Sequence, residues 1–200
     1  MRKIMYYVHQ SLDGFIEGPN GEFDWAQLGP ELSDYSMSLA ERSSTFLYGR
    51  TVWELMSSYW PHAESMNPDE HAVAFAPIWR ETEKIVLSTT LESADWNSRV
   101  IRSAEEINAI KAGPGKDILV TGSASVAAAL TELGLLDEYH VIVHPVVLGG
   151  GKPVYQPPSK RIELRLAESR TFDGRTVLLR HDLRQWRTAS TTKGRRNRAH

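Results

Sequence analysis

The chain contains one local pattern twice: a short apolar run that ends in glycine and leads directly into a helical segment. The first copy covers residues 45–54 and the second covers residues 118–126. Each copy predicts a strand that feeds a helix N-terminus, where free N–H groups and the positive end of the helix dipole favour an anion such as phosphate. Glycine lets the backbone turn sharply and approach a ligand closely. Two such ends together indicate a dinucleotide site in an α/β fold.

The alternative for either copy alone is an ordinary strand-to-helix turn, where α/β proteins commonly use glycine. Neither copy has the spacing of a G-x-G-x-x-G fingerprint. The first copy adds Arg50, whose guanidinium suits phosphate, and Thr51, whose hydroxyl can donate a hydrogen bond. The prediction therefore depends on the combination of the two copies.

Length and composition predict one soluble domain. The chain has 200 residues, of which 41% are hydrophobic, and this is enough for one substantial core. It has no cysteine, which excludes disulfides, a thiol nucleophile and thiolate metal sites. No apolar run approaches the length of a membrane span or of a signal-peptide core, so we expect a cytoplasmic protein.

Charge is unevenly distributed along the chain. The formal net charge is −2, but residues 187–200 hold five basic residues and no acid, which leaves −7 for residues 1–186. An acidic body argues against a nucleic-acid-binding surface. We expect residues 1–186 to form the domain, and residues 187–200 to be a disordered basic tail that is dispensable for folding.

Hydrophobic periodicity predicts strands that alternate with helices through most of the chain. A strand at residues 3–8 is followed by a long loop rich in turn residues, and such loops are more often functional than idle. The helix at 103–112 opens on what looks like a capping box, Ser103 to Glu106. The other predicted elements are helices near 32–39, 71–80 and 125–133 and strands near 45–49, 84–87, 99–101 and 118–121.

The last third of the chain changes to a β-rich pattern. A run at residues 138–147 precedes two strands, at 162–172 and 176–183, which flank the turn Asp173-Gly174 as a terminal hairpin. The alternating part predicts parallel strands with right-handed crossovers, and the hairpin adds antiparallel strands at one edge. We therefore predict an α/β fold with a mixed sheet of about eight strands.

Taken in order, these segments resemble the dihydrofolate reductase-like superfamily. Within it they are similar to small proteins that resemble the reductase (C-terminal) domain of bifunctional riboflavin-biosynthesis deaminase/reductases. The resemblance covers about residues 2–183 and implies a three-layer α/β/α fold. It depends on five motifs in register: Ser-Leu-Asp-Gly at 11–14, Gly-Arg-Thr at 49–51 with Trp53, Val-Leu-Ser-Thr-Thr at 86–90, Thr-Gly-Ser at 121–123 and Pro-Val-Val-Leu-Gly-Gly-Gly at 145–151.

The resemblance implies an NADPH-dependent reductase, with the cofactor across the carboxyl ends of the strands. Ser88 and Thr89 would lie near the adenosine 2′-phosphate, although their hydroxyls fit an ordinary strand-to-turn transition equally well. Relatives also imply a homodimer. The residues implied at the cofactor are Gly49, Arg50, Thr51, Ser88, Thr89, Gly122, Ser123, Ala124, Ser125 and Val126.

The implied substrate is a small flat heterocycle, pterin-like or pyrimidine-like, as in 5-amino-6-(5-phosphoribosylamino)uracil reductase and dihydrofolate reductase. Asp34 is within one residue of the spacing at which dihydrofolate reductases carry a carboxylate that assists protonation, but a solvated helix-face aspartate has the same pattern. Asp24 and Trp25 resemble a pocket feature of the small reductases, and Trp25 can alternatively anchor its loop to the core. Leu12 and Asp13 belong to the loop implied beside the nicotinamide.

Two departures from the resemblance affect the substrate. Riboflavin-pathway reductases read Val-Glu-Gly-Gly where this chain reads Val-Thr-Gly-Ser at 120–123, and the threonine that dihydrofolate reductases carry in the later strand is missing from 139–144. A non-catalytic nucleotide-binding or scaffold protein that retains the fold is therefore the alternative. We predict no metal site, because His140 and His144 share a strand face without a further ligand pair.

Overall fold

The computed structural model describes residues 1–155 and 161–183, and its centre is a sheet of eight strands. The strand order is β5-β4-β3-β6-β1-β7-β10-β9. The first six of these strands are parallel to their neighbours, and β10 is antiparallel to both β7 and β9. This confirms the predicted mixed sheet with an antiparallel C-terminal hairpin. The strands are β1 (Ile4–Ser11), β3 (Ser43–Gly49), β4 (Glu83–Leu87), β5 (Ser98–Ile101), β6 (Asp117–Thr121), β7 (Glu138–His144), β9 (Arg165–Phe172) and β10 (Thr176–Asp182).

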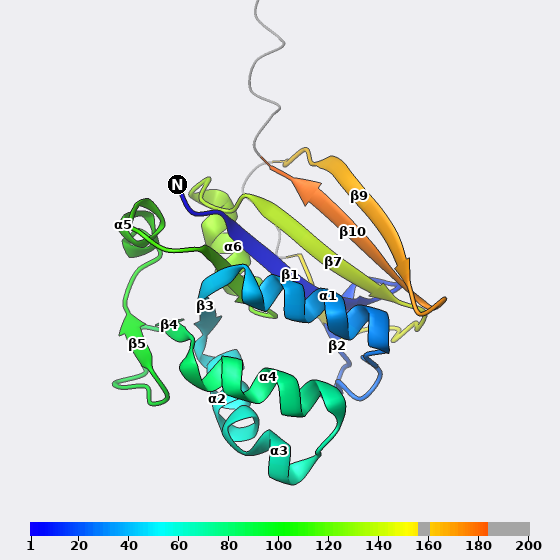
Figure 1. Cartoon of the computed structure of the whole chain (residues 1–200). Helices are drawn as coiled ribbons and strands as arrows, with labels where there is room; N and C mark the ends of the chain where they lie inside the picture. Colours follow the sequence, from blue (N-terminus) through cyan, green and yellow to red (C-terminus); the bar gives the residue numbers. More distant parts are fainter. Residues whose placement is uncertain (156–160, 184–200) are drawn as a thin grey trace, which may run out of the picture.

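Helices cover both faces of the sheet, which gives three layers (Figure 1). One face carries α1, α2 and α4, with the short η1 and α3 between α2 and α4; the other face carries α5 and α6. The helices are α1 (Pro30–Glu41), α2 (Arg50–Tyr59), η1 (Trp60–His62), α3 (Ala63–Met66), α4 (Glu70–Glu81), α5 (Glu106–Ala112) and α6 (Ala124–Glu132).

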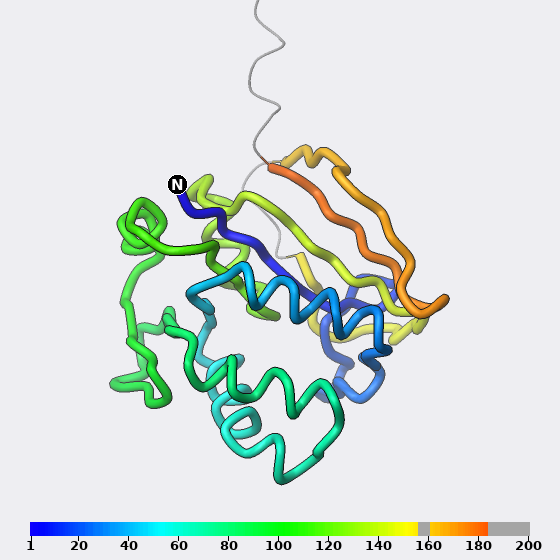
Figure 2. Tube along the Cα trace, viewed as in Figure 1, coloured from blue at the N-terminus to red at the C-terminus, as the bar shows by residue number. Residues whose placement is uncertain are grey.

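The strand β1 divides the core into two clusters because its side chains alternate between the faces. It lies in the middle of the sheet, between β6 and β7 (Figure 2). Tyr6 and Val8 belong to the cluster under α5 and α6, whereas Met5 and Tyr7 belong to the cluster under α1, α2 and α4. Trp53 and Trp79 stack in the second cluster with ring centroids 6.0 Å apart, and Trp60 packs against the same cluster.

Aspartate side chains cap the N-termini of α1 and α4. In the turn between β9 and β10, Asp173 accepts hydrogen bonds from the backbone N–H groups of Glu31 (3.0 Å) and Leu32 (3.3 Å) at the start of α1. Asp69 accepts one from Ala72 N at 2.7 Å at the start of α4. The predicted Asp173-Gly174 turn therefore both closes the hairpin and fixes α1 over the sheet.

The long loop after β1 contains a short strand that the sequence pattern did not predict. β2 (Phe15–Glu17) pairs with β8 (Lys152–Pro153) in a separate two-stranded sheet. The contact needs Gly151, which has φ +125°, because a Cβ there would lie 2.0 Å from the carbonyl oxygen of Glu17. Two glycine-containing motifs that are distant in sequence, at 11–14 and 145–151, are thus held together.

Several predicted boundaries shift in the structure: β7 ends at His144 rather than at residue 147, and three further shifts have a visible cause. β1 continues to Ser11 because its backbone stays paired with β7 up to His144, whatever the polarity of the side chains. β9 begins at Arg165 rather than at residue 162, because its partner β10 ends at Asp182, opposite Arg165. Regular α5 begins at Glu106, although the Glu106 carboxylate accepts a hydrogen bond from Ser103 N at 3.0 Å, which is half of the predicted capping box.

The predicted domain boundary at residue 186 and the tail at 187–200 lie outside the described residues. Among the described helices, none combines the length and the hydropathy that crossing a membrane requires.

Candidate functional site

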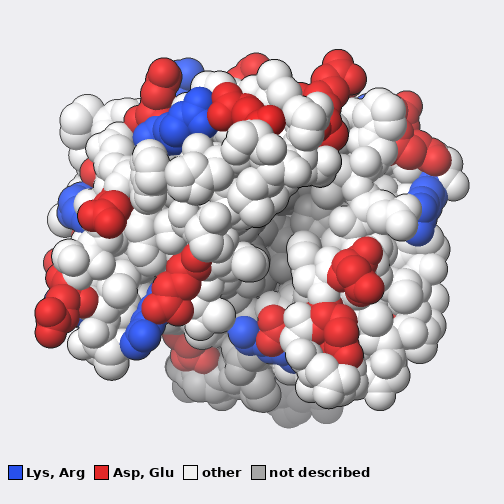
Figure 3. Space-filling model, turned by 90° about the horizontal axis from the view of Figure 1, so that it is seen from below, with Lys and Arg blue, Asp and Glu red and all other residues white. Residues whose placement is uncertain are grey.

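The carboxyl ends of the parallel strands meet at one edge of the sheet, where α2 and the loop around β2 also lie. These elements occupy the lower part of Figure 1, and the view from below is hollowed near its middle (Figure 3). Open α/β sheets bind ligands at this edge. The two glycine turns of the sequence both lie there, at the ends of β3 and β6.

A hydrogen bond joins the two glycine turns. Gly49 N donates to the Ser123 hydroxyl at 2.9 Å, and these two residues are the N-caps of α2 and α6. In the described part of the chain, no side chain caps either helix, in contrast to α1 and α4, where aspartates do. The Ser123 hydroxyl serves the neighbouring turn instead of its own helix. The first N–H groups of both helices are therefore left facing the same edge.

The two glycines are required for this close approach. A Cβ on Gly49 would lie 3.3 Å from a methyl carbon of Val126 and 3.6 Å from the Ser123 hydroxyl oxygen. Gly122 has φ +65°, and its N–H donates to Tyr7 O at 3.1 Å. A side chain at either position would separate α2 from α6 or strain the turn between β6 and α6.

Two guanidinium groups flank the loop after β4. Arg50 donates to Glu54 at 2.7 Å and to the Thr90 hydroxyl at 3.0 Å. The loop itself is closed by the Ser88 hydroxyl, which accepts from the N–H groups of Thr90 and Leu91. Thr89 is exposed beside them. The loop thus presents an exposed hydroxyl next to a fixed positive charge.

Arg102 is the second guanidinium at this loop, and sequence reasoning missed it. It donates to the carbonyl oxygens of Ser88 (2.9 Å) and Leu91 (2.6 Å). Its position directly after β5, at the carboxyl edge, is the signal that would have identified it.

Beside this edge, rings from β1, α1, β7 and the loop before α1 form what we call the aromatic–histidine cluster. Trp25 packs edge-on against His144 at 5.4 Å between ring centroids, and the rings of His9 and His144 are 5.1 Å apart. The cluster lies on the face of the sheet that α1 covers. Its members are Tyr7, His9, Phe23, Trp25, Tyr35, His140 and His144.

One chain of hydrogen bonds in the cluster ends at His144. The Tyr7 hydroxyl is 2.9 Å from His9 Nε2, and His9 Nδ1 is 2.8 Å from His144 Nε2. Burial lowers the pKa of His9 to about 3 and that of His144 to about 4, so both rings are neutral at pH 7. His144 Nδ1 is buried and has no hydrogen-bond partner among the described residues. If the Tyr7 hydroxyl donates to His9, His144 Nδ1 carries a proton and is a donor. If the Tyr7 hydroxyl accepts from His9, His144 Nδ1 is an acceptor.

A second chain links α1 to the start of β7. The Tyr35 hydroxyl is 2.6 Å from His140 Nδ1, and His140 Nε2 is 2.9 Å from Glu138. The hydrogen bond with His140 lowers the pKa of Glu138 to about 2, and burial lowers the pKa of His140. An ionised Glu138 accepts from Nε2–H, which leaves Nδ1 as the acceptor for the Tyr35 hydroxyl. The Tyr35 oxygen thus donates inward and keeps its lone pairs for an outside donor.

A family model described as the RibD C-terminal domain matches residues 2–178. The chain belongs to this family. The uncharacterized protein YyaP of Bacillus subtilis (strain 168) is 35% identical over 181 residues, which are 88% of this chain and 92% of that protein.

Solved structures share the fold. A putative riboflavin biosynthesis protein from Shewanella sp. PV-4 matches with a TM-score of 0.69 at 18% identity, covering 91% of this chain and 98% of that chain. A dihydrofolate reductase from Enterococcus faecalis, complexed with NADP(H) and RAB-propyl, matches with a TM-score of 0.61 at 16% identity, covering 90% and 95%. The dihydrofolate reductase-like fold and the resemblance to the riboflavin-biosynthesis reductase domain are confirmed.

In this RibD C-terminal domain, the two acids predicted on the substrate side are exposed. Asp34 lies on the outer side of α1, whose buried side carries Leu32 and Leu39. Asp24 is exposed in the loop before α1. The structure brings neither carboxylate into the cluster, and their catalytic role stays a prediction.

The three residues predicted on the substrate-side loops, Leu12, Asp13 and Trp25, have different contacts and exposure. The Asp13 carboxylate accepts from the N–H groups of Leu148 (3.1 Å) and Gly149 (2.8 Å), so it fastens its loop to the glycine-rich segment after β7. Leu12 is 65% exposed and Trp25 is half-buried in the cluster.

The histidines were the main residues that sequence reasoning missed. Sequence patterns assigned no role to His9, and His140 and His144 were considered only as metal ligands. All three lie on the α1 face of the adjacent strands β1 and β7. The available signal was the even spacing within each strand, two residues from Tyr7 to His9 and four residues from His140 to His144. The described residues include no group of three or more His, Cys, Asp or Glu arranged to hold a metal ion.

Proposed function

We propose that this protein is an NADPH-dependent reductase that transfers hydride to a small, flat, conjugated heterocycle. The observation that carries the proposal is the hydrogen bond from Gly49 N to the Ser123 hydroxyl, which sets two helix N-termini without side-chain caps next to each other. Such a pair suits the two phosphates of a dinucleotide. The family match and the fold shared with an NADP(H)-bound dihydrofolate reductase support the choice of cofactor.

The residues at the edge fit this cofactor. Gly49 and Gly122 provide close backbone approach, and the exposed Thr51 and Ser125 lie in the first turns of α2 and α6, where Ala124 and Val126 contribute further N–H groups. The pyrophosphate would bind at these N-termini. Arg50, in the first turn of α2, would add a charged contact to the pyrophosphate. The 2′-phosphate would bind at Ser88 and Thr89, next to Arg102, which gives the preference for NADPH over NADH.

The aromatic–histidine cluster would hold the substrate. Trp25 offers a ring for a flat heterocycle to pack on, and Leu12 and Asp13 keep the loop after β1 beside it. The Tyr35 oxygen accepts a hydrogen bond from a ring N–H, and His144 Nδ1 takes a second polar atom.

The bound NADPH supplies the hydride, and the protein supplies orientation, exclusion of water and the route for a proton. Neutral His144, at the end of its chain of hydrogen bonds, can hold a proton at Nδ1. Asp34 and Asp24 are the candidate carboxylates, and both are exposed in the structure. The proposal includes a cytoplasmic location and no nucleic-acid partner, as composition and charge predict, and a homodimer, as the resemblance implies.

The second candidate is a nucleotide-binding protein without catalysis, and the exposed positions of Asp34 and Asp24 favour it. The test is NADPH oxidation, followed at the nicotinamide absorbance band, with a panel of pterins, pyrimidines and related heterocycles. We expect turnover with at least one compound, and slower turnover in Tyr35→Phe. Saturable NADPH binding without oxidation by any compound of the panel would select the second candidate.

A further inference from the structure

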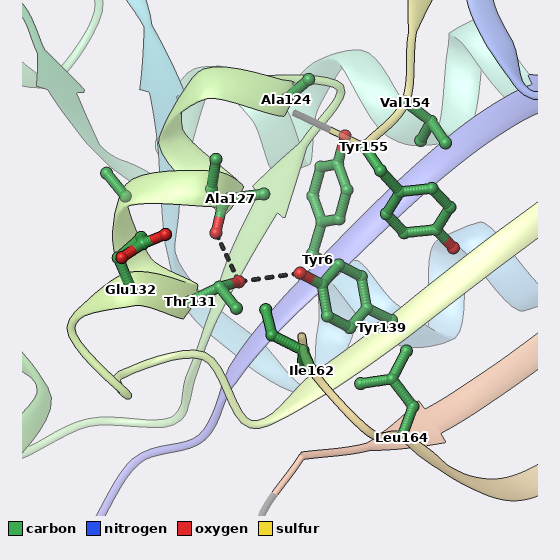
Figure 4. Close-up of a pocket in the computed structure, with 12 residues that line it drawn as sticks. Tyr6, Ala124, Ala127, Thr131, Glu132, Tyr139, Val154, Tyr155, Ile162 and Leu164 are labelled. Atoms are coloured by element: carbon green, nitrogen blue, oxygen red, sulfur yellow. Dashed lines mark hydrogen bonds between the residues drawn. The ribbon is translucent and has the colours of Figure 1, made fainter. Parts of the chain in front are cut away.

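A cavity of about 290 Å³ lies on the face of the sheet opposite the aromatic–histidine cluster. Its volume is near the lower end of the range for small-molecule sites. Three tyrosines, the alanine-rich side of α6 and the apolar residues Val154, Ile162 and Leu164 line it (Figure 4). It touches α6 along its length, whereas the proposed phosphate site uses only the N-terminus of that helix.

The first observation that points to a ligand is the hydroxyl of Tyr6. Tyr6 is 0% exposed, and its hydroxyl has no hydrogen-bond partner among the described residues. The ring rises from β1 into the cavity, with its oxygen toward the end near Ala124 and Val154 (Figure 4). Buried hydroxyls are normally hydrogen-bonded, so the Tyr6 hydroxyl has the capacity to donate a hydrogen bond to a ligand and to accept one from it.

The second observation is the fixed orientation of Tyr139. Thr131 Oγ1 donates to Ala127 O at 2.7 Å, as a helix hydroxyl with one proton must. The Tyr139 hydroxyl, 2.7 Å from the same oxygen, is therefore the donor of that pair. The rings of Tyr6 and Tyr139 meet edge-on at 5.7 Å, and those of Tyr139 and Tyr155 are 6.0 Å apart. Three aromatic rings in mutual contact thus form one wall of the cavity.

The charge of the lining excludes anions. Among the described residues that line the cavity, Glu132 is the only charged one. Burial raises the pKa of Tyr6, Tyr139 and Tyr155, so their hydroxyls stay neutral. A phosphate or a carboxylate would find no positive partner in this lining.

We propose that the cavity is a second binding site, for a small uncharged aromatic molecule that carries one hydrogen-bond acceptor. The ring packs between α6 and the tyrosines, and the acceptor, such as a carbonyl oxygen, binds the Tyr6 hydroxyl. The site shares Ala124 with the proposed pyrophosphate site, and its other lining residues lie outside that site.

The probes for the test are acetophenone and ethylbenzene, which have the same ring and differ in the carbonyl oxygen. Methyl NMR of the full chain follows Val154, Ile162 and Leu164 during each titration. We expect saturable shifts at these methyls, with acetophenone the tighter probe. Tyr6→Phe should weaken acetophenone about two- to tenfold, the range for one neutral hydrogen bond, and leave ethylbenzene unchanged.

A filling variant provides the second arm. Ala128→Leu should abolish binding of both probes, while Ala109→Leu, at an exposed position of α5, should not affect it. The proposal is overturned if neither probe shifts these methyls, if Ala128→Leu binds as wild type does, or if Tyr6→Phe binds acetophenone with unchanged affinity. It is also overturned if the probes fail and Ala128→Leu converts a dimer into a monomer in sedimentation, which would assign the cavity to an interface between two copies.

Discussion

Replacing Arg50 with Ala should weaken the binding of both NADPH and NADH about 5- to 70-fold. A hydrogen bond from a charged group contributes about 1.5–3 kcal/mol. Part of this is offset, because Arg50 must leave Glu54, an exposed pair four residues apart on a helix that is worth about 0.3–0.5 kcal/mol. The remaining ~1–2.5 kcal/mol corresponds to the stated change in Kd.

The assay is the quenching of tryptophan fluorescence by each nucleotide, and Arg99→Ala is the matched control. The Arg99 side chain is 49% exposed and is paired with Glu83, compared with 51% for Arg50, but it lies near the amino end of β5. Its loss should leave both affinities unchanged. The reasoning is refuted if Arg50→Ala binds NADPH as tightly as wild type does, or if Arg99→Ala loses as much.

Four further predictions follow from the same geometry. Arg102→Ala should weaken the binding of NADPH at least fivefold more than the binding of NADH, measured by the same titration. Equal losses of affinity would remove Arg102 from the 2′-phosphate site. Gly122→Val should weaken both nucleotides by at least tenfold with an unchanged circular dichroism spectrum, and retained affinity would argue against close approach at that turn. Asp34→Asn should lower the rate of turnover more than the affinity for NADPH; an unchanged rate and pH profile would remove it from the mechanism. Because the folded-state pKa of His144 is lowered, its contribution to stability is lost as the pH falls from 6.5 toward 4, and at pH 5 the loss is about 2 kcal/mol. Between pH 7 and pH 5 the free energy of unfolding, measured with urea, should therefore fall less in His144→Gln than in wild type. An equal fall would contradict the lowered pKa of His144.

The sequence predicted the elements whose side-chain pattern is set by the core. The parallel strands, the hairpin turn at Asp173-Gly174 and the two glycine turns follow from burial, periodicity and turn chemistry, which are local properties. Boundaries failed where backbone pairing with a distant strand decides them. β1 runs past Val8 because β7 provides a partner up to His144.

The candidate site was predictable on its phosphate side and much less on its substrate side. Glycine before a helix marks an N-terminus from sequence alone, so Gly49 and Gly122 were found. The hydrogen bond between the two turns was not predictable, because Ser123 carries no sign that it serves Gly49 rather than its own helix. The contact between Tyr35 and His140 joins α1 to β7, two elements distant in sequence, so no local pattern could indicate it.

The most direct test of the account is a titration of ¹⁵N-labelled protein with NADPH, followed by backbone amide NMR, because it measures binding and locates it at the same time. The account predicts saturable shifts that are largest at the amides of Thr51, Ser125 and Val126, in the first turns of α2 and α6. No saturable shift at millimolar NADPH, or shifts concentrated away from these two helix N-termini, would contradict it.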